Sequence, residues 1–264
     1  MAARRARQTV RGRGGAPAAG PAGEAAFLAA YDPDRFERIS VAVDVALLSA
    51  TEGALHALVV RRDDHPARGR WALPGGFVGP AEPLEAAAAR VLAGKAGLEG
   101  LFVEQLFTFG DPGRDPRTRV ISVASYALVD FARFAGAARR AEGVAVGRLV
   151  VPWAGETGGP VELRSAADRP LPLAFDHADI LGMAVKRLRG KLDYAPIGFQ
   201  LLAPGFTLLE LQRVHETILG RPLNKDSFRR RMLASGWLEA TGERQAAVDH
   251  RPAERYRFAR RSAT

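Results

Sequence analysis

The groups best suited to chemistry lie between Trp71 and Leu98. The turn LPGG at residues 73–76 ends in two glycines, so its backbone can approach a phosphate closely. A helix is expected to follow, and three carboxylates at positions i, i+3 and i+4 of a helix would share one face. Such an oxygen cluster suits Mg²⁺, which polarises a diphosphate and activates water. The segment therefore has the layout of a site that hydrolyses pyrophosphate bonds.

This layout resembles the Nudix box, whose pattern is G-x(5)-E-x(7)-R-E-U-x-E-E-x-G-U, where U is aliphatic. Six positions fit the pattern in one register: Gly76, Glu82, Arg90, Leu92, Gly97 and Leu98. At the three helix glutamates of the pattern, this chain has Val91, Gly94 and Lys95. Valine and glycine cannot ligate a hard cation, and a lysine ammonium repels one. We therefore predict a domain that binds a nucleotide without cutting it, and assign no catalytic residue and no metal ligand.

Length and composition limit the possible classes of protein. A chain of 264 residues is long enough for two domains. It has no cysteine for disulfides or thiolate metal sites, and no apolar run approaches the roughly 18 residues of a membrane helix. We expect a cytoplasmic protein that does not enter a membrane. The net charge of +9 favours an acidic partner, but a GC-rich genome also yields arginine-rich chains, so the charge alone decides little.

Residues 1–33 are predicted to form a disordered basic tail. The segment before Glu24 is rich in alanine, glycine, proline and arginine and contains no acidic residue. Such a composition cannot bury enough apolar surface to fold. The tail lacks the amphipathic pattern and the serines of a transit peptide. A DNA-touching arm and an overextended start site both remain open.

Residues 34–193 are expected to form an α/β (α+β) domain. Alternating and β-branched residues predict four strands: Ile39–Leu48, Leu55–Arg62, Phe102–Phe109 and Val120–Val129. The alanine-rich segment 83–93 is the predicted box helix. The segment 174–192 has the periodicity of an amphipathic helix, with Asp176 as its N-cap. The Nudix resemblance implies that these elements form an α/β/α sandwich.

A small helical unit with a hairpin is predicted at 206–260, after a connector at 194–205. Thr207 and Glu210 form the capping box of a first helix, which ends at Gly220. Asn224 or Asp226 can cap a second helix. On this second helix, the side chains predicted to face the core are those of Phe228, Met232 and Leu233. Strand-like runs at 237–241 and 254–258 complete a winged helix-turn-helix.

The exposed face of the second helix is predicted to bind DNA. On a helical wheel, Arg230 and Arg231 lie opposite the buried residues, whereas Arg229 lies nearer the apolar arc. Arginine can bind guanine bidentately, and a helix N-terminus can meet base edges or phosphates. The predicted DNA-binding residues are Asn224, Lys225, Ser227, Arg230, Arg231, Arg244 and Arg251. The alternative is a solvated basic helix on a protein-interaction module.

A diphosphate bound without a metal needs cations or backbone amides around it. The predicted ligand-binding residues are Arg62, Gly75, Gly76, Lys95, Arg114 and Arg119. Arg90 is expected to orient the box loop through Glu82 instead. Arg114 beside Asp115 could also be an exposed ion pair of little worth.

Nearly the whole chain, from about Asp34 to Phe258, resembles the Nudix-related transcriptional regulators of the NrtR type. The stretches FTLLELQRVHETILGRPLNKDSFRRRML and RPAERYRF are the most characteristic of the C-terminal module. The resemblance implies a homodimer on a palindromic operator in double-stranded DNA. It also implies ADP-ribose or a related nucleotide as effector, with no required cofactor.

We therefore expect a ligand-responsive repressor of NAD or nucleotide-cofactor metabolism. The helix at 176–192 and the connector after it are expected to link the pocket to the DNA reader. Two alternatives remain: an active hydrolase of ADP-ribose-like nucleoside diphosphate derivatives, and a protein-interaction scaffold.

Overall fold

The computed structural model describes residues 23–51, 53–140, 142–245 and 252–259, and forms two compact units that divide between Arg38 and Ile39. The first unit contains α1 (Glu24–Ala30) and the 3₁₀ helix η1 (Pro33–Arg35). Helix α1 lies inside the segment that was predicted to be disordered. Its alanines and its acidic first turn favour a helix. None of its residues is buried. The rest of the predicted basic segment, residues 1–22, lies outside the described part.

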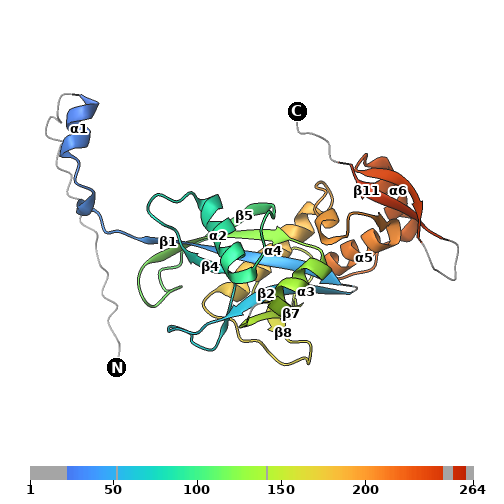
Figure 1. Ribbon diagram of the computed structural model, residues 1–264, viewed down its shortest axis with the longest axis horizontal. Coiled ribbons are helices and arrows are strands. Elements are labelled where there is room, and N and C mark those ends of the chain that lie inside the picture. The colour runs from blue at the N-terminus through green and yellow to red at the C-terminus, as the bar shows by residue number, and fades with distance from the viewer. Residues whose placement is uncertain (1–22, 52, 141, 246–251, 260–264) are drawn as a thin grey trace, which may run out of the picture. The chain divides into compact units, whose positions relative to one another are not determined.

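A mixed sheet forms the centre of the second unit (Figure 1). Its strands are β1 (Ser40–Thr51), β2 (Ala54–Arg61), β3 (Trp71–Ala72), β4 (Gly75–Phe77), β5 (Val103–Phe109), β6 (Val120–Leu128), β7 (Val144–Val150) and β8 (Glu162–Arg164). The main order is β5-β6-β1-β2-β7-β8, with β3 beside β2 and β4 beside β1. The four predicted strands correspond to β1, β2, β5 and β6. Most of the strands that were not predicted are only two or three residues long.

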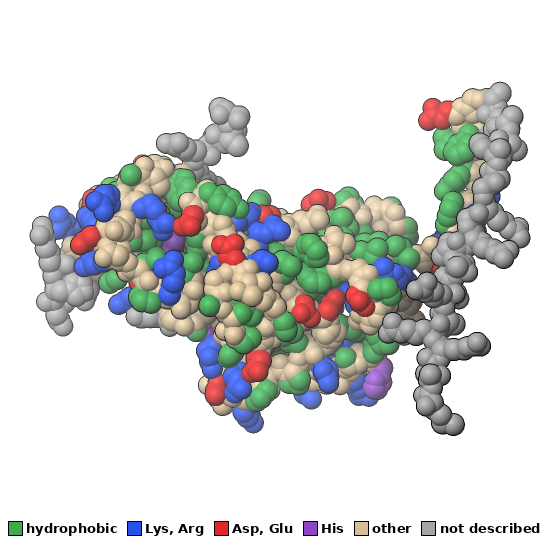
Figure 2. Space-filling view, turned by 180° about the vertical axis from the view of Figure 1, so that it is seen from behind, with side chains coloured by type: hydrophobic (Ala, Val, Ile, Leu, Met, Phe, Trp, Pro, Cys, Tyr) green, Lys and Arg blue, Asp and Glu red, His purple; other side chains and the backbone are tan. Residues whose placement is uncertain are grey.

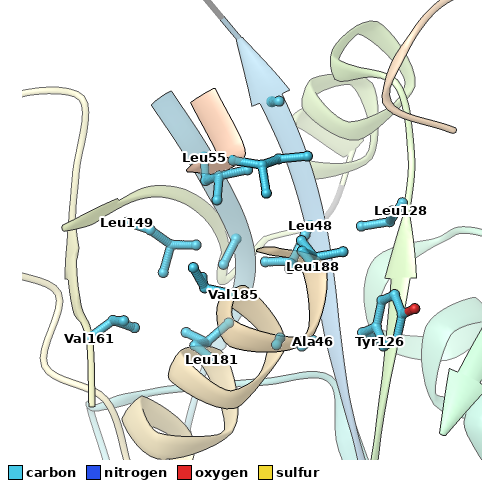
Figure 3. Close-up of a cluster of buried hydrophobic side chains, with 14 of the residues drawn as sticks. Ala46, Leu48, Leu55, Tyr126, Leu128, Leu149, Val161, Leu181, Val185 and Leu188 are labelled. Carbon is cyan, nitrogen blue, oxygen red and sulfur yellow. The ribbon is translucent and has the colours of Figure 1, made fainter. Parts of the chain in front are cut away.

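Helices cover both faces of this sheet. On one side lie α2 (Leu84–Ala96) and α3 (Phe131–Arg140), and on the other lies α4 (His177–Lys191) (Figure 1). Side chains alternate along a strand, so Val45 of β1 packs with the α2 layer and Leu48 with the α4 layer. Figure 3 shows Leu181, Val185 and Leu188 of α4 beside side chains of the sheet. The predicted α/β/α sandwich is confirmed.

The C-terminal part is a winged helix-turn-helix. It consists of β9 (Phe206–Thr207), α5 (Leu208–Leu219), α6 (Lys225–Ala234), β10 (Leu238–Arg244) and β11 (Glu254–Phe258). The capping box of Thr207 and Glu210 is present, and Asn224 rather than Asp226 caps α6. Among the described helices, none has the length and apolar content needed to cross a membrane.

One core residue of α6 was predicted wrongly. Phe228 and Met232 are buried, but Leu233 is 45% exposed. A helix turns about 100° per residue, so Leu233 is rotated away from the line that joins the two buried side chains. The face of α6 that packs inward is therefore narrower than the sequence pattern indicated.

Helix α5 belongs to both halves of the second unit. Its Val214 and Ile218 pack in the core of the sheet and α4, whereas Leu208 and Leu211 pack with Phe228 of α6. The α/β/α domain and the winged helix therefore share one helix.

Protonation of His215 should weaken the fold. This α5 side chain is 2% exposed, and burial lowers its pKa from 6.5 to about 4. Between these two pH values the unfolded chain binds more protons than the folded chain, so the free energy of unfolding falls as the pH falls below about 6.5. We expect urea midpoints to decrease from pH 7 to pH 5, with a shallower decrease for His215→Gln. Equal pH dependence of the two proteins would contradict this assignment.

Candidate functional site

A cavity of about 380 Å³ lies where β1, β2, the box turn and the start of α4 meet. The predicted ligand-binding residues that line it are Arg62, Gly75, Gly76, Lys95 and Arg114. They come from segments far apart in the chain, which the fold brings together. Arg119 is not part of the cavity lining. Its guanidinium lies near Gly110, with a buried nitrogen that has no hydrogen-bond partner among the described residues.

The loop of the box has the arrangement expected from the sequence. Arg90 donates two hydrogen bonds to the Glu82 carboxylate, at 2.6 and 2.7 Å, and a third to the Phe77 carbonyl. Glu82 also accepts a bond from the Gly79 N–H. These hydrogen bonds lower the pKa of Glu82 to about 2, and the bond from Arg90 has the largest effect. The frame of the Nudix loop is thus intact.

The residues at the three glutamate positions of the box pattern do not suit a Mg²⁺ ion. Val91 is buried in the core, and Gly94 has no side chain. The Lys95 ammonium donates a hydrogen bond to the Gly75 carbonyl at the edge of the cavity, and desolvation by burial lowers its pKa. Within the described residues, no group of three or more acidic or histidine side chains is placed to hold a metal ion. A fixed ammonium therefore stands on the box helix where the family pattern has a metal ligand.

A buried charge cluster forms the floor of the cavity. Arg114, with a side chain 5% exposed, binds both oxygens of Asp176 at 2.8 and 2.9 Å and lies 3.3 Å from Asp44. Asp44 also accepts a bond from Ser122. The alternative pairing of Arg114 with Asp115 is not formed, because Asp115 binds Arg117 instead. Arg114 is thus a buried part of the site rather than an exposed ion pair.

Two further parts of the cavity wall were not predicted from the sequence. His177 accepts a hydrogen bond from the Leu73 N–H through Nδ1, and burial lowers its pKa, which keeps it neutral. Phe175 lies under the Arg62 guanidinium, 4.9 Å from it. Both residues lie next to Asp176. For that segment the sequence predicted only an amphipathic helix and its N-cap.

A groove of the winged helix is lined by a set of basic residues that overlaps only partly with the predicted DNA-binding set. Lys225, Arg229 and Arg244 line a groove of about 590 Å³ between α6, the start of α5 and the wing. Within the described part of the chain, these three cations and Arg230 are exposed and form no ion pair. Basic side chains also gather over this end of the molecule on the face shown in Figure 2.

The surroundings of Arg229 and Arg231 differ from those that the helical wheel indicated. Arg229 is four residues after Lys225 and shares its face, so it lines the groove. Arg231 is three residues after Phe228; it lies 5.8 Å from that ring and forms an ion pair with Asp193, which precedes the connector. Asn224 and Ser227 lie at the exposed start of α6 and hydrogen-bond to each other there. Arg251 lies outside the described residues.

The fold and the site define a Nudix-type domain joined to a winged helix that binds DNA. A family model described as "NUDIX domain" matches residues 38–143, and one described as "NrtR DNA-binding winged helix domain" matches residues 198–258. The ADPR responsive transcriptional repressor NtrR of Acinetobacter baylyi is 38% identical over 238 residues, which cover 89% of this chain and 88% of that protein.

Solved structures show the same arrangement. Shewanella oneidensis NrtR complexed with a 27mer DNA is 33% identical, with a TM-score of 0.70 over 83% of this chain and 93% of that chain. A MutT/nudix family protein from Enterococcus faecalis is 26% identical, with a TM-score of 0.71 over 90% of this chain and 94% of that chain. This chain belongs to the NrtR family of Nudix-related transcriptional regulators.

Proposed function

We propose that this chain is a cytoplasmic repressor that binds ADP-ribose without hydrolysing it and changes its affinity for operator DNA in response. The observation that carries the proposal is the Lys95 ammonium at the edge of the cavity, on a box helix without its metal carboxylates. The domain that contains this cavity belongs to the same compact unit as a winged helix whose groove cations form no ion pair with the described residues.

The cavity suits a nucleotide diphosphate that arrives without a metal. Its volume lies within the usual range for small-molecule sites. Lys95 and Arg62 supply positive charge, and the Gly75-Gly76 backbone leaves room for close approach. Neither cation forms a close ion pair with a carboxylate among the described residues: Arg62 donates to the Pro66 carbonyl and Lys95 to that of Gly75. Both are therefore available to the phosphates.

The winged helix supplies the DNA contacts. Lys225, Arg229 and Arg244 are placed to follow a phosphate backbone along the groove, and Arg230 to reach base edges. The exposed start of α6, where the Asn224 side chain accepts a hydrogen bond from the Ser227 N–H, adds the positive end of the helix dipole. Since each chain carries one such module, a homodimer on a palindromic operator is the arrangement that we propose.

The relatives support the choice of effector and target. The Acinetobacter protein is named as ADPR responsive, and the Shewanella protein was crystallised with DNA. We extend both properties to this chain because the resemblance covers its pocket domain and its winged helix together. Genes of NAD or nucleotide-cofactor metabolism are the proposed targets.

Effector binding should persist when divalent metals are removed. We expect ADP-ribose to bind with the same Kd in EDTA and in Mg²⁺, and to change retention of a duplex selected by this protein from random DNA. No AMP should accumulate in either buffer, because Val91, Gly94 and Lys95 cannot hold a metal. Val91→Glu alone should not restore hydrolysis, since the other two positions stay unchanged. Calorimetry, DNA retention and nucleotide chromatography would measure the three results.

Two outcomes would contradict the proposal. Rapid cleavage of ADP-ribose with Mg²⁺ or Mn²⁺ would make the chain a hydrolase with an appended module. A failure of the wild-type protein to select any DNA sequence would remove the repressor assignment.

A further inference from the structure

Helix α4 touches the effector cavity at one end and the winged helix at the other. Its first residue, His177, lines the cavity, and its N-cap residue Asp176 holds Arg114. Arg189, in its last turn, contacts α5. With 15 residues, α4 spans about 22 Å. Helix α4 therefore connects the cavity directly to the winged helix.

At the cavity end of α4, Arg114 binds Asp176 and also lines the cavity. Its Nε and one terminal nitrogen bind both oxygens of Asp176, and the Asp176 carboxylate makes no capping bond to α4. Arg114 also lines the cavity, where a diphosphate would compete for it. A ligand that draws the guanidinium toward itself weakens its hold on Asp176 and frees that carboxylate to cap α4.

The middle of α4 is packed too tightly to absorb such a change. Ile180, Leu181 and Val185 are fully buried against the sheet. A close-packed interior transmits a shift of the helix instead of damping it.

At the far end, Arg189 joins three segments through backbone carbonyls. Its Nε donates to the Ile218 carbonyl of α5 at 2.8 Å, and NH1 donates to the carbonyls of Gly155 and Trp153. The guanidinium also lies over the Trp153 ring, 4.8 Å from its centre. The residue is 7% exposed and has no acidic partner in the described part of the chain. Among the described residues, these carbonyls and the ring are the groups that contact its buried charge.

The contact with Ile218 matters because α5 is shared by the two halves. Ile218 packs with the sheet core, while Leu211 of the same helix packs against Phe228 of the DNA-facing α6. A change in the pose of α5 therefore changes that of α6.

We propose that Arg189 is the positioning residue that couples the effector cavity to the DNA-binding helix, by tying the end of α4 to the end of α5. The proposal rests on the function proposed above and names its regulation. Arg189 touches neither ligand, so its removal should affect the coupling between the two sites more than binding at either.

The test uses the full chain, ADP-ribose and the selected DNA duplex. The coupling factor is the ratio of the DNA Kd with saturating ADP-ribose to the Kd without it. Wild-type protein should give a factor of about 5 to 150 in either direction. Arg189→Gln should bring it toward 1 while it still binds each ligand alone. The matched control is Arg187→Gln, which removes an arginine on the same helix that donates to the Leu106 carbonyl of β5, and should keep the wild-type factor.

A second variant covers the case in which Arg189→Gln does not fold. Asp176→Asn keeps the size of the side chain but weakens its hold on Arg114. ADP-ribose should then bind more tightly and change DNA affinity less. A wild-type coupling factor in folded Arg189→Gln, or wild-type values of both quantities in Asp176→Asn, would overturn the inference. Wild-type protein that binds no ADP-ribose or no DNA would overturn the proposed function instead.

Discussion

Replacing both Arg229 and Arg230 by alanine is expected to weaken operator binding by more than the loss of one good arginine–base contact, which costs about 1–3 kcal/mol. Both side chains are exposed on α6, and neither forms an ion pair among the described residues. Arg229 lines the groove with Lys225 and Arg244, so its loss should also reduce the salt dependence of binding. Fluorescence anisotropy with the selected duplex, at several fixed salt concentrations, would measure both effects.

Arg231→Ala is the matched control for this variant. Arg231 is the next residue of the same helix, but its guanidinium pairs with Asp193, and that exposed pair contributes little to stability. We expect a much smaller loss of DNA affinity than for Arg229→Ala. Equal losses for the two single variants would show that the groove is not the DNA-binding face.

Gly182→Ala is expected to destabilise the protein by about 1–3 kcal/mol or more, although alanine is the better helix former. Gly182 lies inside α4, and a Cβ there would be 1.8 Å from the Gly159 carbonyl oxygen. That atom belongs to backbone, so relief requires the 158–160 loop or the helix to move. Urea unfolding followed by circular dichroism would measure the loss.

Gly94→Ala should have the opposite sign. Gly94 also lies inside a helix, α2, but a Cβ there would meet nothing within 4 Å. Alanine should therefore stabilise the protein by about 0.5–1 kcal/mol, because glycine loses more backbone entropy on folding. Destabilisation by both substitutions would mean that helix propensity and local space do not account for these glycines.

Local patterns in the sequence were enough to predict the two domains. The box register, the alternation of the strands and the capping box of Thr207 and Glu210 each depend on residues close together in the chain. The absence of the box carboxylates at Val91, Gly94 and Lys95 could be read in the same way, because their positions follow from the register alone. The α/β/α sandwich, which the Nudix resemblance implied, and the winged helix are both confirmed.

The partners of individual charges could not be predicted in this way. Arg114 was considered beside Asp115, its neighbour in the chain, but it pairs with Asp176, which is 62 residues away. Arg231 was placed on the DNA-binding face by its position on a helical wheel, yet it turns to Asp193 before the connector. A wheel describes one helix and contains no information about the segment that packs beside it.

The sequence by itself determined the order of the Nudix-type domain and the winged helix, the register of the box, and which residues, Val91, Gly94 and Lys95, stand at its glutamate positions, because each depends on short-range spacing. Only the tertiary structure decided which arginines line the groove of the winged helix, which arginine is buried beside the cavity of the first domain, and that α5 is shared by both halves. Those features depend on contacts between segments far apart in the chain, such as Arg189 with Ile218. Helix packing and sheet order set these contacts, and no local pattern encodes them.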